Sequence, residues 1–320
     1  MFLRKALLIT LSIFFSLLVS EISLRIKHSI VLDYDIEMWR YAKLLKIKDF
    51  NPKINHTHKK NSKAILQGVE IKINNFGQRD IDYTNNTLKN YKKSFLFLGS
   101  SVTLGWGVDN NKTYVQLLNE NAKKNEKNWI FINGGIGNYN TERYTNNYFE
   151  NWSNLNFTDI IVNFFANDTE LINQKETNLF VRNTHLGVAI WKIFHFIKNS
   201  SKQESLQEYY VNKYKDDFEG YKITKEELLN LKDFCKKRNI TLHIILIPDI
   251  NYTNSFPYPL SFIGEKISKF SNENKIKYYD LYNSVSNVEN NKLRNKYKDL
   301  HPNDLGHLLF SRAIYRYLAE

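Results

Sequence analysis

The sequence contains a single cysteine, Cys235, among 320 residues, so no disulfide can form within the chain. The fold must therefore depend on its hydrophobic core in whichever compartment it occupies. Hydrophobic residues make up 42% of the chain and aromatic residues 14%, which is ample for one large domain or two modest ones. We expect a globular protein in which Cys235 is inert packing.

Signatures of nucleic-acid binding are also missing. The net charge is +12, but no recognised binding module and no basic helix with heptads is present, so we expect no nucleic-acid partner. The lysines are scattered among many asparagines, which is typical of a solvated surface. The sequence also offers too few ligands for a metal site, because His56 and His58 have no clear third ligand nearby. We expect both histidines on the surface, and neither a metal nor a cofactor.

Charge is absent from fourteen residues near the N-terminus, Ala6 to Val19, which follow Arg4 and Lys5. The length suits a signal-peptide core, but the sequence Leu-Val-Ser at its end makes a poor cleavage site. We therefore expect residues 1–25 to be an uncleaved signal anchor. Positive charge before the run predicts a cytoplasmic N-terminus with the rest exported. A buried N-terminal helix is the alternative.

The stretch SFLFLGSSVTLGWGV, from Ser94 to Val108, is the part of the sequence on which the functional interpretation depends most. A short apolar run leads into Gly99 and then into a glycine-rich turn that contains Ser100 and Ser101. A phosphate-binding loop would need a following Gly-Lys-Ser/Thr, which is missing, and the G-x-S-x-G pattern does not fit. A serine nucleophile at Ser101 and an ordinary turn remain open on this stretch alone.

Apolar strands alternate with helix-compatible segments through the remaining chain. The pattern predicts strands at 129–133, 159–168, 241–247 and 276–282, and helices at 113–124, 141–152, 224–238 and from about 303. A capping box of Thr224 and Glu227 marks the start of the third helix. Such alternation predicts a parallel, doubly wound sheet covered on both faces, with functional residues at the carboxyl ends of its strands.

Two regions stand apart from this alternation. Residues 26–93 are expected to be a lead-in segment that packs on the catalytic domain, with helical spacing at 34–47 and strand-like alternation from Val69. Residues 169–222 are an insertion between two strands, and it contains an apolar helix from Leu186 to Ile197. We expect a plain core helix there, with a lid, an acyl-binding wall or a membrane contact as alternatives.

The strand-end loops and the start of the last helix hold candidates for serine acyl transfer. This chemistry needs a nucleophile, a base, a group that orients the base, and donors for the oxyanion. Ser101 is the candidate nucleophile, His301 the general base, and Asp299 the acid that orients it. The backbone N–H groups of Ser101 and Gly135 and the side-chain amide of Asn167 would receive the oxyanion.

Four blocks in this order resemble the SGNH hydrolases, also called GDSL-type esterases: LGSSVTLGWGV, INGGIGNYN, FFANDTE and DLHPNDLGH. The resemblance covers residues 94–318, and KINNFGQRD looks like the segment before the serine block in membrane-anchored bacterial members. It implies a flavodoxin-like three-layer α/β/α fold for an SGNH hydrolase domain at 94–320. The implied activity is ester hydrolysis or acyl transfer on acylated carbohydrates, lipids or small esters.

Three positions depart from the family pattern. Ser100 stands where the family usually has Asp, and Phe165 replaces the glycine of G-x-N-D. The usual D-x-x-H spacing would place the acid at Lys298, so Asp299 lies one residue nearer to His301.

We expect an exported, membrane-anchored esterase that removes a short acyl group, such as acetyl, from a cell-envelope glycan. Hydrolysis and transfer share one acyl-enzyme, so the alternative enzyme is a carbohydrate O-acyltransferase that works with a membrane partner as acyl donor. A glycan-binding or assembly module that has lost catalysis is the alternative from another class.

Overall fold

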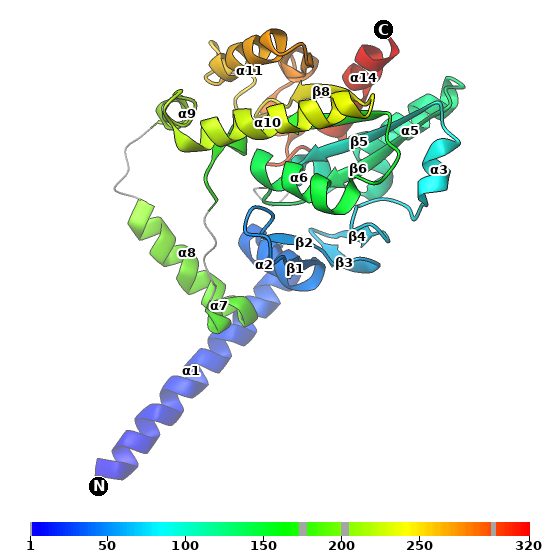
Figure 1. The fold of residues 1–320 in the computed structure, drawn as a ribbon. Helices are drawn as coiled ribbons and strands as arrows, with labels where there is room; N and C mark the ends of the chain where they lie inside the picture. The colour runs from blue at the N-terminus through cyan, green and yellow to red at the C-terminus, as the bar shows by residue number, and fades with distance from the viewer. Residues whose placement is uncertain (1, 173–177, 200–204, 296–298) are drawn as a thin grey trace. The chain divides into compact units, whose positions relative to one another are not determined.

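The computed structural model describes residues 2–172, 178–199, 205–295 and 299–320 (Figure 1). Its contacts divide the chain into two compact units, residues 1–43 with 175–204, and residues 44–174 with 205–320. Two stretches of the expected insertion, 173–177 and 200–204, and the family's usual acid position, Lys298, lie outside the described residues.

The larger unit is built on a parallel sheet, as the alternation predicted. Each neighbouring pair of strands runs parallel, and their carboxyl ends share one edge. The strands lie in the order β6 (Trp129–Gly135), β5 (Lys93–Gly99), β7 (Asp159–Phe164), β8 (Thr241–Leu246) and β9 (Lys277–Asp280). The expected α/β class with a mainly parallel sheet is therefore confirmed.

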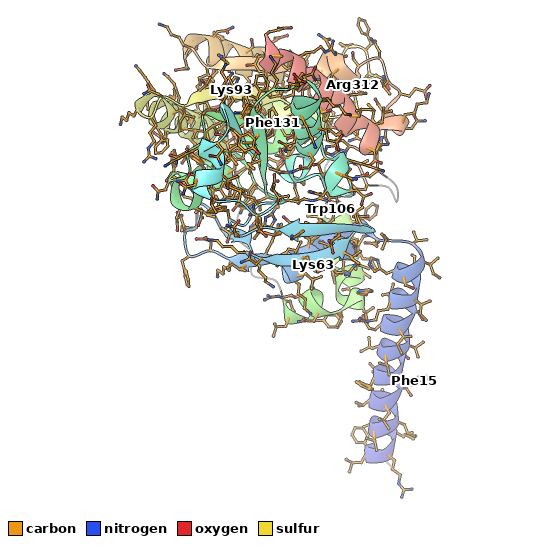
Figure 2. All side chains as sticks on the ribbon, turned by 90° about the vertical axis from the view of Figure 1, so that its right-hand side faces the viewer. Phe15, Lys63, Lys93, Trp106, Phe131 and Arg312 are labelled. Carbon is orange, nitrogen blue, oxygen red and sulfur yellow. The ribbon has the colours of Figure 1, made fainter. Side chains whose placement is uncertain are left out.

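Helices cover both faces of this sheet and form its two cores. Strand residues alternate between them, so that Leu96 and Leu98 point to one core and Phe95 and Phe97 to the other. The first core includes α6 (Thr141–Asn147), α9 (Leu206–Lys213), α10 (Glu219–Lys237) and α11 (Ser261–Glu273). The second includes α5 (Tyr114–Lys124), α12 (Tyr282–Val285), α13 (Asn290–Leu293) and α14 (Asp304–Ala319). Phe131 lies deep in the second core (Figure 2).

The expected inert role of Cys235 agrees with its place in the first core. The thiol is buried, and burial raises its pKa to about 12, so it stays protonated and unreactive near neutral pH.

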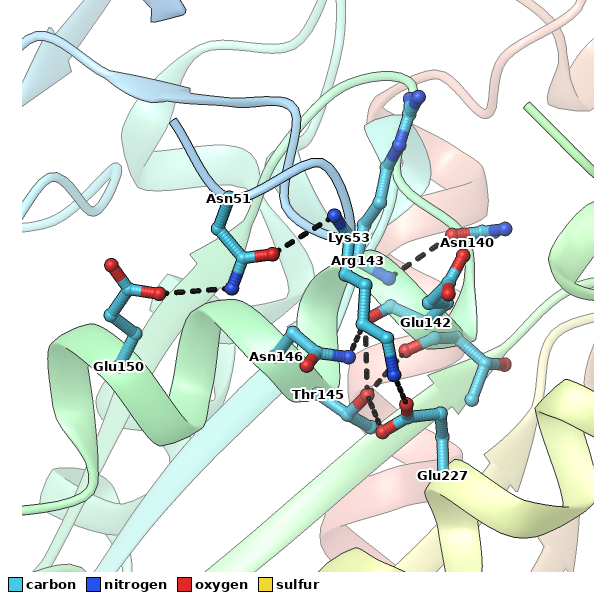
Figure 3. A network of polar contacts seen from close by, with 10 residues as sticks. Asn51, Lys53, Asn140, Glu142, Arg143, Thr145, Asn146, Glu150 and Glu227 are labelled. Atoms are coloured by element: carbon cyan, nitrogen blue, oxygen red, sulfur yellow. Dashed lines mark hydrogen bonds and ion pairs between the residues drawn. The ribbon is translucent and has the colours of Figure 1, made fainter. Parts of the chain in front are cut away.

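The lead-in chain of the larger unit forms two antiparallel hairpins, β1 (Lys46–Lys48) with β2 (His56–His58) and β3 (Ser62–Leu66) with β4 (Val69–Ile73), followed by α3 (Asn85–Lys89). Its loop is tied to the first helical layer (Figure 3). Asn51 donates to Glu150 at 3.1 Å, and Lys53 pairs with Glu227 at 3.6 Å. Glu227 also accepts the Thr145 hydroxyl at 3.1 Å.

The expectation of surface histidines was wrong. His56 is 8% exposed and His58 is 2% exposed, and their ring nitrogens contact the carbonyl oxygens of Gly137 and Gly77. Burial lowers the pKa of His58 to about 3, so the ring is neutral at physiological pH. Among the described residues, no group of three or more His, Cys, Asp or Glu side chains is placed to hold a metal ion.

The expected capping box at Thr224 was also wrong. Helix α10 begins at Glu219, so Thr224 and Glu227 lie inside it and are buried. The Thr224 hydroxyl donates to the carbonyl of Asp168 instead. A capping-box pattern was satisfied here by tertiary contacts rather than by a helix start.

The smaller unit contains α1 (Phe2–Ile30), most of α2 (Tyr34–Leu45), α7 (Leu179–Asn183) and α8 (His185–Asn199). Of the described helices, α1 is the one long and apolar enough to cross a membrane, a test that an N-terminal signal sequence also passes. Its apolar side chains stand exposed, as Phe15 does in Figure 2. The expectation of a plain core helix at 186–197 was wrong, because Phe194 and Phe196 on α8 are 68% and 76% exposed.

Candidate active site

Ser101 is presented where β5 ends. It is the first residue of the short helix α4 (Ser101–Leu104), so its backbone N–H has no acceptor within the helix. Gly105 ends the helix in a left-handed conformation with φ +79°. Gly99 is required just before the turn, because a Cβ there would lie 2.3 Å from the Thr103 hydroxyl oxygen. The sequence thus forces a sharp strand-to-helix turn with Ser101 at its start.

His301 connects Ser101 to Asp299 by hydrogen bonds. Its Nε2 lies 2.7 Å from Ser101 Oγ, and its Nδ1 lies 2.6 Å from Asp299 Oδ1. A neutral imidazole that donates from Nδ1 to Asp299 leaves Nε2 to accept the serine proton. The Asp299 side chain is 1% exposed and that of His301 is 14% exposed, so the carboxylate is shielded while the base remains accessible.

The short D-x-H spacing works through a local turn. Asp299 Oδ1 accepts the backbone N–H of His301 at 3.0 Å, which is the hydrogen bond of an Asx turn. The same oxygen therefore holds both the backbone and the ring of His301. The spacing that departs from the family pattern still brings the acid to the base.

Asn295 fixes the histidine loop against the serine loop. Its backbone N–H donates to the carbonyl of His301 at 2.9 Å, and its Nδ2 donates to the carbonyl of Trp106 at 2.8 Å. Asn303, the N-cap of α14, accepts from Leu305 and Gly306 and donates to the carbonyl of Arg294. These local bonds place His301 beside Ser101, although the two residues lie 200 positions apart.

The structure corrects one predicted oxyanion donor, Gly135. Its backbone N–H donates to Asn133 Oδ1 at 3.0 Å and is therefore occupied. A Cβ at Gly135 would lie 2.2 Å from the backbone nitrogen of Leu104, so this glycine serves close packing between β6 and α4. Of the three predicted donors, the N–H of Ser101 and the side chain of Asn167 remain.

Asn167 follows β7, the strand next to β5, in the turn η3 (Ala166–Thr169). This turn is held by Tyr214, whose hydroxyl donates to the carbonyl of Ala166, and by Tyr144, whose hydroxyl donates to Asp168 Oδ2 at 2.9 Å. Asn167 Oδ1 is buried and has no hydrogen-bond partner within the described residues. Phe165, in place of the family's glycine, packs partly buried against both cores.

Asp168 makes the stability of this turn depend on pH. Burial raises the pKa of Asp168 to about 8, against about 3.9 in an unfolded chain. The folded protein therefore keeps a proton that the unfolded chain loses, and its stability falls as pH rises from about 4 to about 8. We expect the Tm of the Asp168→Asn variant minus the Tm of the unchanged protein to increase as pH rises from 5 to 8. The exposed Asp216, replaced by Asn, should show a pH-independent difference over this range, and the same flat result for Asp168→Asn would contradict the raised pKa.

Arg79, from the lead-in stretch KINNFGQRD, supports the helix that begins with Ser101, α4. Its guanidinium is fully buried and donates to the carbonyls of Leu104, Gly105 and Val108, the last at 2.7 Å. These carbonyls belong to the end of α4 and the turn after it, which have no partners within a helix. The lead-in segment thereby shapes the nucleophile turn.

We expect Arg79→Leu to lower the free energy of unfolding by about 3 kcal/mol or more, because several buried carbonyl oxygens would lose their donors. Denaturant unfolding of the detergent-solubilised protein measures this loss. Arg238 is the matched control, since it is exposed and its guanidinium donates to the carbonyl of Ser153. A loss for Arg79→Leu no larger than that for Arg238→Leu would contradict the supporting role.

A cavity of about 390 Å³ opens at the carboxyl edge of β8 and β9. Tyr258, Tyr282, Asp249 and Asp280 are among its lining residues, and the two tyrosine rings stack with centroids 4.8 Å apart. Burial raises the pKa of both carboxyl groups. Asn251 ties this wall to the histidine loop, because its Nδ2 donates to Asp249 Oδ1 and to the carbonyl of Leu300.

No protein-family model matches the sequence, and no curated protein matches it. Solved structures that are similar to this chain were found. An acetylxylan esterase from Geobacillus stearothermophilus is 14% identical, with 72% of this chain and 96% of that chain covered and a TM-score of 0.46. A GDSL-like lipase from Bacteroides thetaiotaomicron is 14% identical over 73% and 93% of the chains, with a TM-score of 0.42. An esterase, EstA, from Pseudoalteromonas sp. is 14% identical over 72% and 100%, with a TM-score of 0.43. The names that these similar structures carry are those of a GDSL-like lipase and of esterases.

Proposed function

We propose that this protein is a serine esterase that cleaves an ester-linked acyl group through an acyl-enzyme on Ser101. The observation that carries the proposal is the pair of short hydrogen bonds on His301, 2.7 Å to Ser101 Oγ and 2.6 Å to Asp299 Oδ1. A hydroxyl, an imidazole and a buried carboxylate in this series are the parts that activate a serine nucleophile.

The first half of the reaction forms the acyl-enzyme. Ser101 Oγ attacks the ester carbonyl carbon while its proton passes to His301 Nε2, and Asp299 stabilises the imidazolium that results. The negative oxygen of the tetrahedral intermediate would accept hydrogen bonds from the backbone N–H of Ser101 and from the side-chain amide of Asn167. The bond to the leaving alcohol then breaks, and the alcohol takes the proton from His301.

The second half releases the acyl group. A water molecule gives a proton to His301 Nε2 and attacks the acyl carbonyl, the bond to Ser101 Oγ breaks, and the serine recovers its proton from His301. A sugar hydroxyl in place of water would make the same site an O-acyltransferase. Hydrolysis is the simpler assignment because it needs no second substrate.

As substrate we propose a short acyl ester, such as acetyl, on a glycan of the cell envelope, with α1 as the membrane anchor and the larger unit exported. The nearby cavity supports a sugar, since its stacked Tyr258 and Tyr282 offer aromatic faces and its carboxyl groups offer acceptors for hydroxyls. The described lining of the cavity includes the carboxyl groups of Asp249, Glu265 and Asp280, and this acidic character disfavours an anionic group there.

The test is a burst assay of the full chain in detergent with p-nitrophenyl acetate, followed by mass spectrometry of the quenched protein. We expect release of nitrophenol and an acetyl adduct that maps to Ser101. Addition of an acetyl-accepting oligosaccharide separates transfer from hydrolysis by its product. A well-folded protein that neither releases nitrophenol nor gains an adduct would overturn the esterase assignment, and glycan binding by that protein would favour the binding module.

A further inference from the structure

Helix α8 carries an exposed stripe of large apolar side chains. Its members recur at the helical spacing i, i+3, i+4 and i+7, which places them on one face. They are Ile190, Ile193, Phe194 and Ile197, with exposed fractions of 36%, 59%, 68% and 61%. On the neighbouring helix α7, Leu179 is 73% exposed. Contiguous apolar surface of this kind marks a contact with an apolar partner.

The opposite face of α8 is fixed within the smaller unit. Val188 is buried, and the ring of Trp191 meets that of Trp39 edge-on at 5.9 Å. Lys192 pairs with Asp33 and with Asp35 at the start of α2, at 2.9 and 2.7 Å. These contacts set the rotation of α8, and the exposed stripe therefore faces away from α2.

Glu21 places the start of α8 beside the end of the apolar run in α1. It is the first charged residue after that run, and its carboxylate accepts the backbone N–H groups of His185 and Leu186 at 3.1 and 2.8 Å. From this point α8 leads away from α1 at a steep angle instead of running alongside it (Figure 1). If α1 spans a bilayer, a helix that leaves it steeply at this level lies in the interfacial zone.

The charges of the two helices suit a lipid surface. The described residues of α7 and α8 include no aspartate or glutamate, so no carboxylate on these helices repels anionic headgroups. Arg182 adds a positive charge, whereas Lys192 is already paired with Asp33 and Asp35. The pair of Trp39 and Trp191 is the residue type that collects at membrane interfaces. The apolar window of α1 is itself unburied, so the stripe continues an apolar surface that already needs lipid.

We propose that α7 and α8 form an interfacial membrane element whose exposed stripe is buried among lipid acyl chains beside the anchor. The proposal rests on the proposed anchoring of the chain by α1. It assigns a second membrane contact to a segment that the sequence pattern alone suggested as a core helix. Such an element would hold the smaller unit at a fixed depth in the membrane surface. Two apolar contacts with the bilayer restrain the tilt of α1, whereas a single contact does not.

The test uses labels on single cysteines. One replacement, Cys235→Ser, removes the single native thiol and leaves each introduced cysteine as the one site of labelling. In a Cys235→Ser background, an environment-sensitive fluorophore is attached to Phe194→Cys or Leu179→Cys, to Phe14→Cys in α1, or to Lys269→Cys on the exposed side of α11. The full chain is placed in vesicles of phosphatidylethanolamine and phosphatidylglycerol. Brominated lipids then quench labels in the acyl region, and iodide quenches labels in water.

We expect labels at 194, 179 and 14 to show blue-shifted emission, quenching by brominated lipid and protection from iodide, while the label at 269 responds to iodide alone. Lipid quenching at 14 together with iodide quenching at 194 and 179 overturns the interfacial element and leaves the anchor intact. Iodide quenching at 14 overturns the anchor, and the inference with it. Protection from both quenchers at 194, with energy transfer between labelled copies, overturns the inference in favour of a dimer contact.

Discussion

Ser101→Ala is expected to lower kcat for p-nitrophenyl acetate by about 10⁴-fold or more, because the side chain that attacks the carbonyl is gone. The remaining rate would come from binding and from oxyanion donors acting on water. KM should change much less, since the missing hydroxyl contributes little to binding the ground state. Steady-state kinetics of the detergent-solubilised full chain, with single-turnover release as a second measurement, gives both constants.

Ser100→Ala is the matched control for this result. Ser100 directly precedes the nucleophile and is 5% exposed, but its side chain makes no hydrogen bond to the start of α4. Its variant should keep activity of the same order as the unchanged protein. Retained turnover in Ser101→Ala, or an equal loss in both variants, would show that the nucleophile lies elsewhere or that the turn itself had been disturbed.

Asp299→Asn is expected to lower kcat by about 10³- to 10⁴-fold near neutral pH, with the fold unchanged. An asparagine amide can donate to Nδ1 of His301, which favours the tautomer that cannot accept the serine proton at Nε2. The carboxylate that stabilises the imidazolium is lost at the same time. The pH profile of kcat separates these effects from unfolding, because a tautomer defect lowers the rate at every pH near neutrality.

Asp249 provides the control acid for this prediction. It lies close enough for His301 to influence its pKa, yet its Oδ1 is engaged by the backbone and side chain of Asn251. We expect Asp249→Asn to change kcat far less than Asp299→Asn does. The reverse order would identify Asp249 as the acid that serves His301, and it would mean that the D-x-H turn holds the histidine without taking part in the reaction.

Local sequence signals predicted the frame of the catalytic unit well. The continuous apolar runs before Gly99 and from Asp159 became neighbouring parallel strands, because such runs bury both faces of a sheet. The expected start of the last helix near Asn303 was confirmed, since its side chain caps the N–H groups of Leu305 and Gly306. These features depend on residues within a few positions of one another.

Most of the failures concern contacts between distant segments. Thr224 and Glu227 fit a helix start by spacing, but they bind Asp168 and Thr145 from inside α10. His56 and His58 lie in β2, and their rings contact the carbonyl oxygens of Gly137 and Gly77, which are 81 and 19 positions away. Neither burial nor the occupancy of a donor can be known before the partner is placed.

The sequence by itself determined the order of the strands and helices along the chain and the turn that presents Ser101. Each of these follows from backbone geometry and hydrogen bonds between near neighbours. Only the tertiary structure decided that His301 reaches Ser101 across 200 positions, that Arg79 supports the serine helix, and that α8 exposes its apolar stripe. The physical reason is that burial and long-range hydrogen bonds are set by which surfaces meet after folding, and local propensity carries no information about the surface opposite.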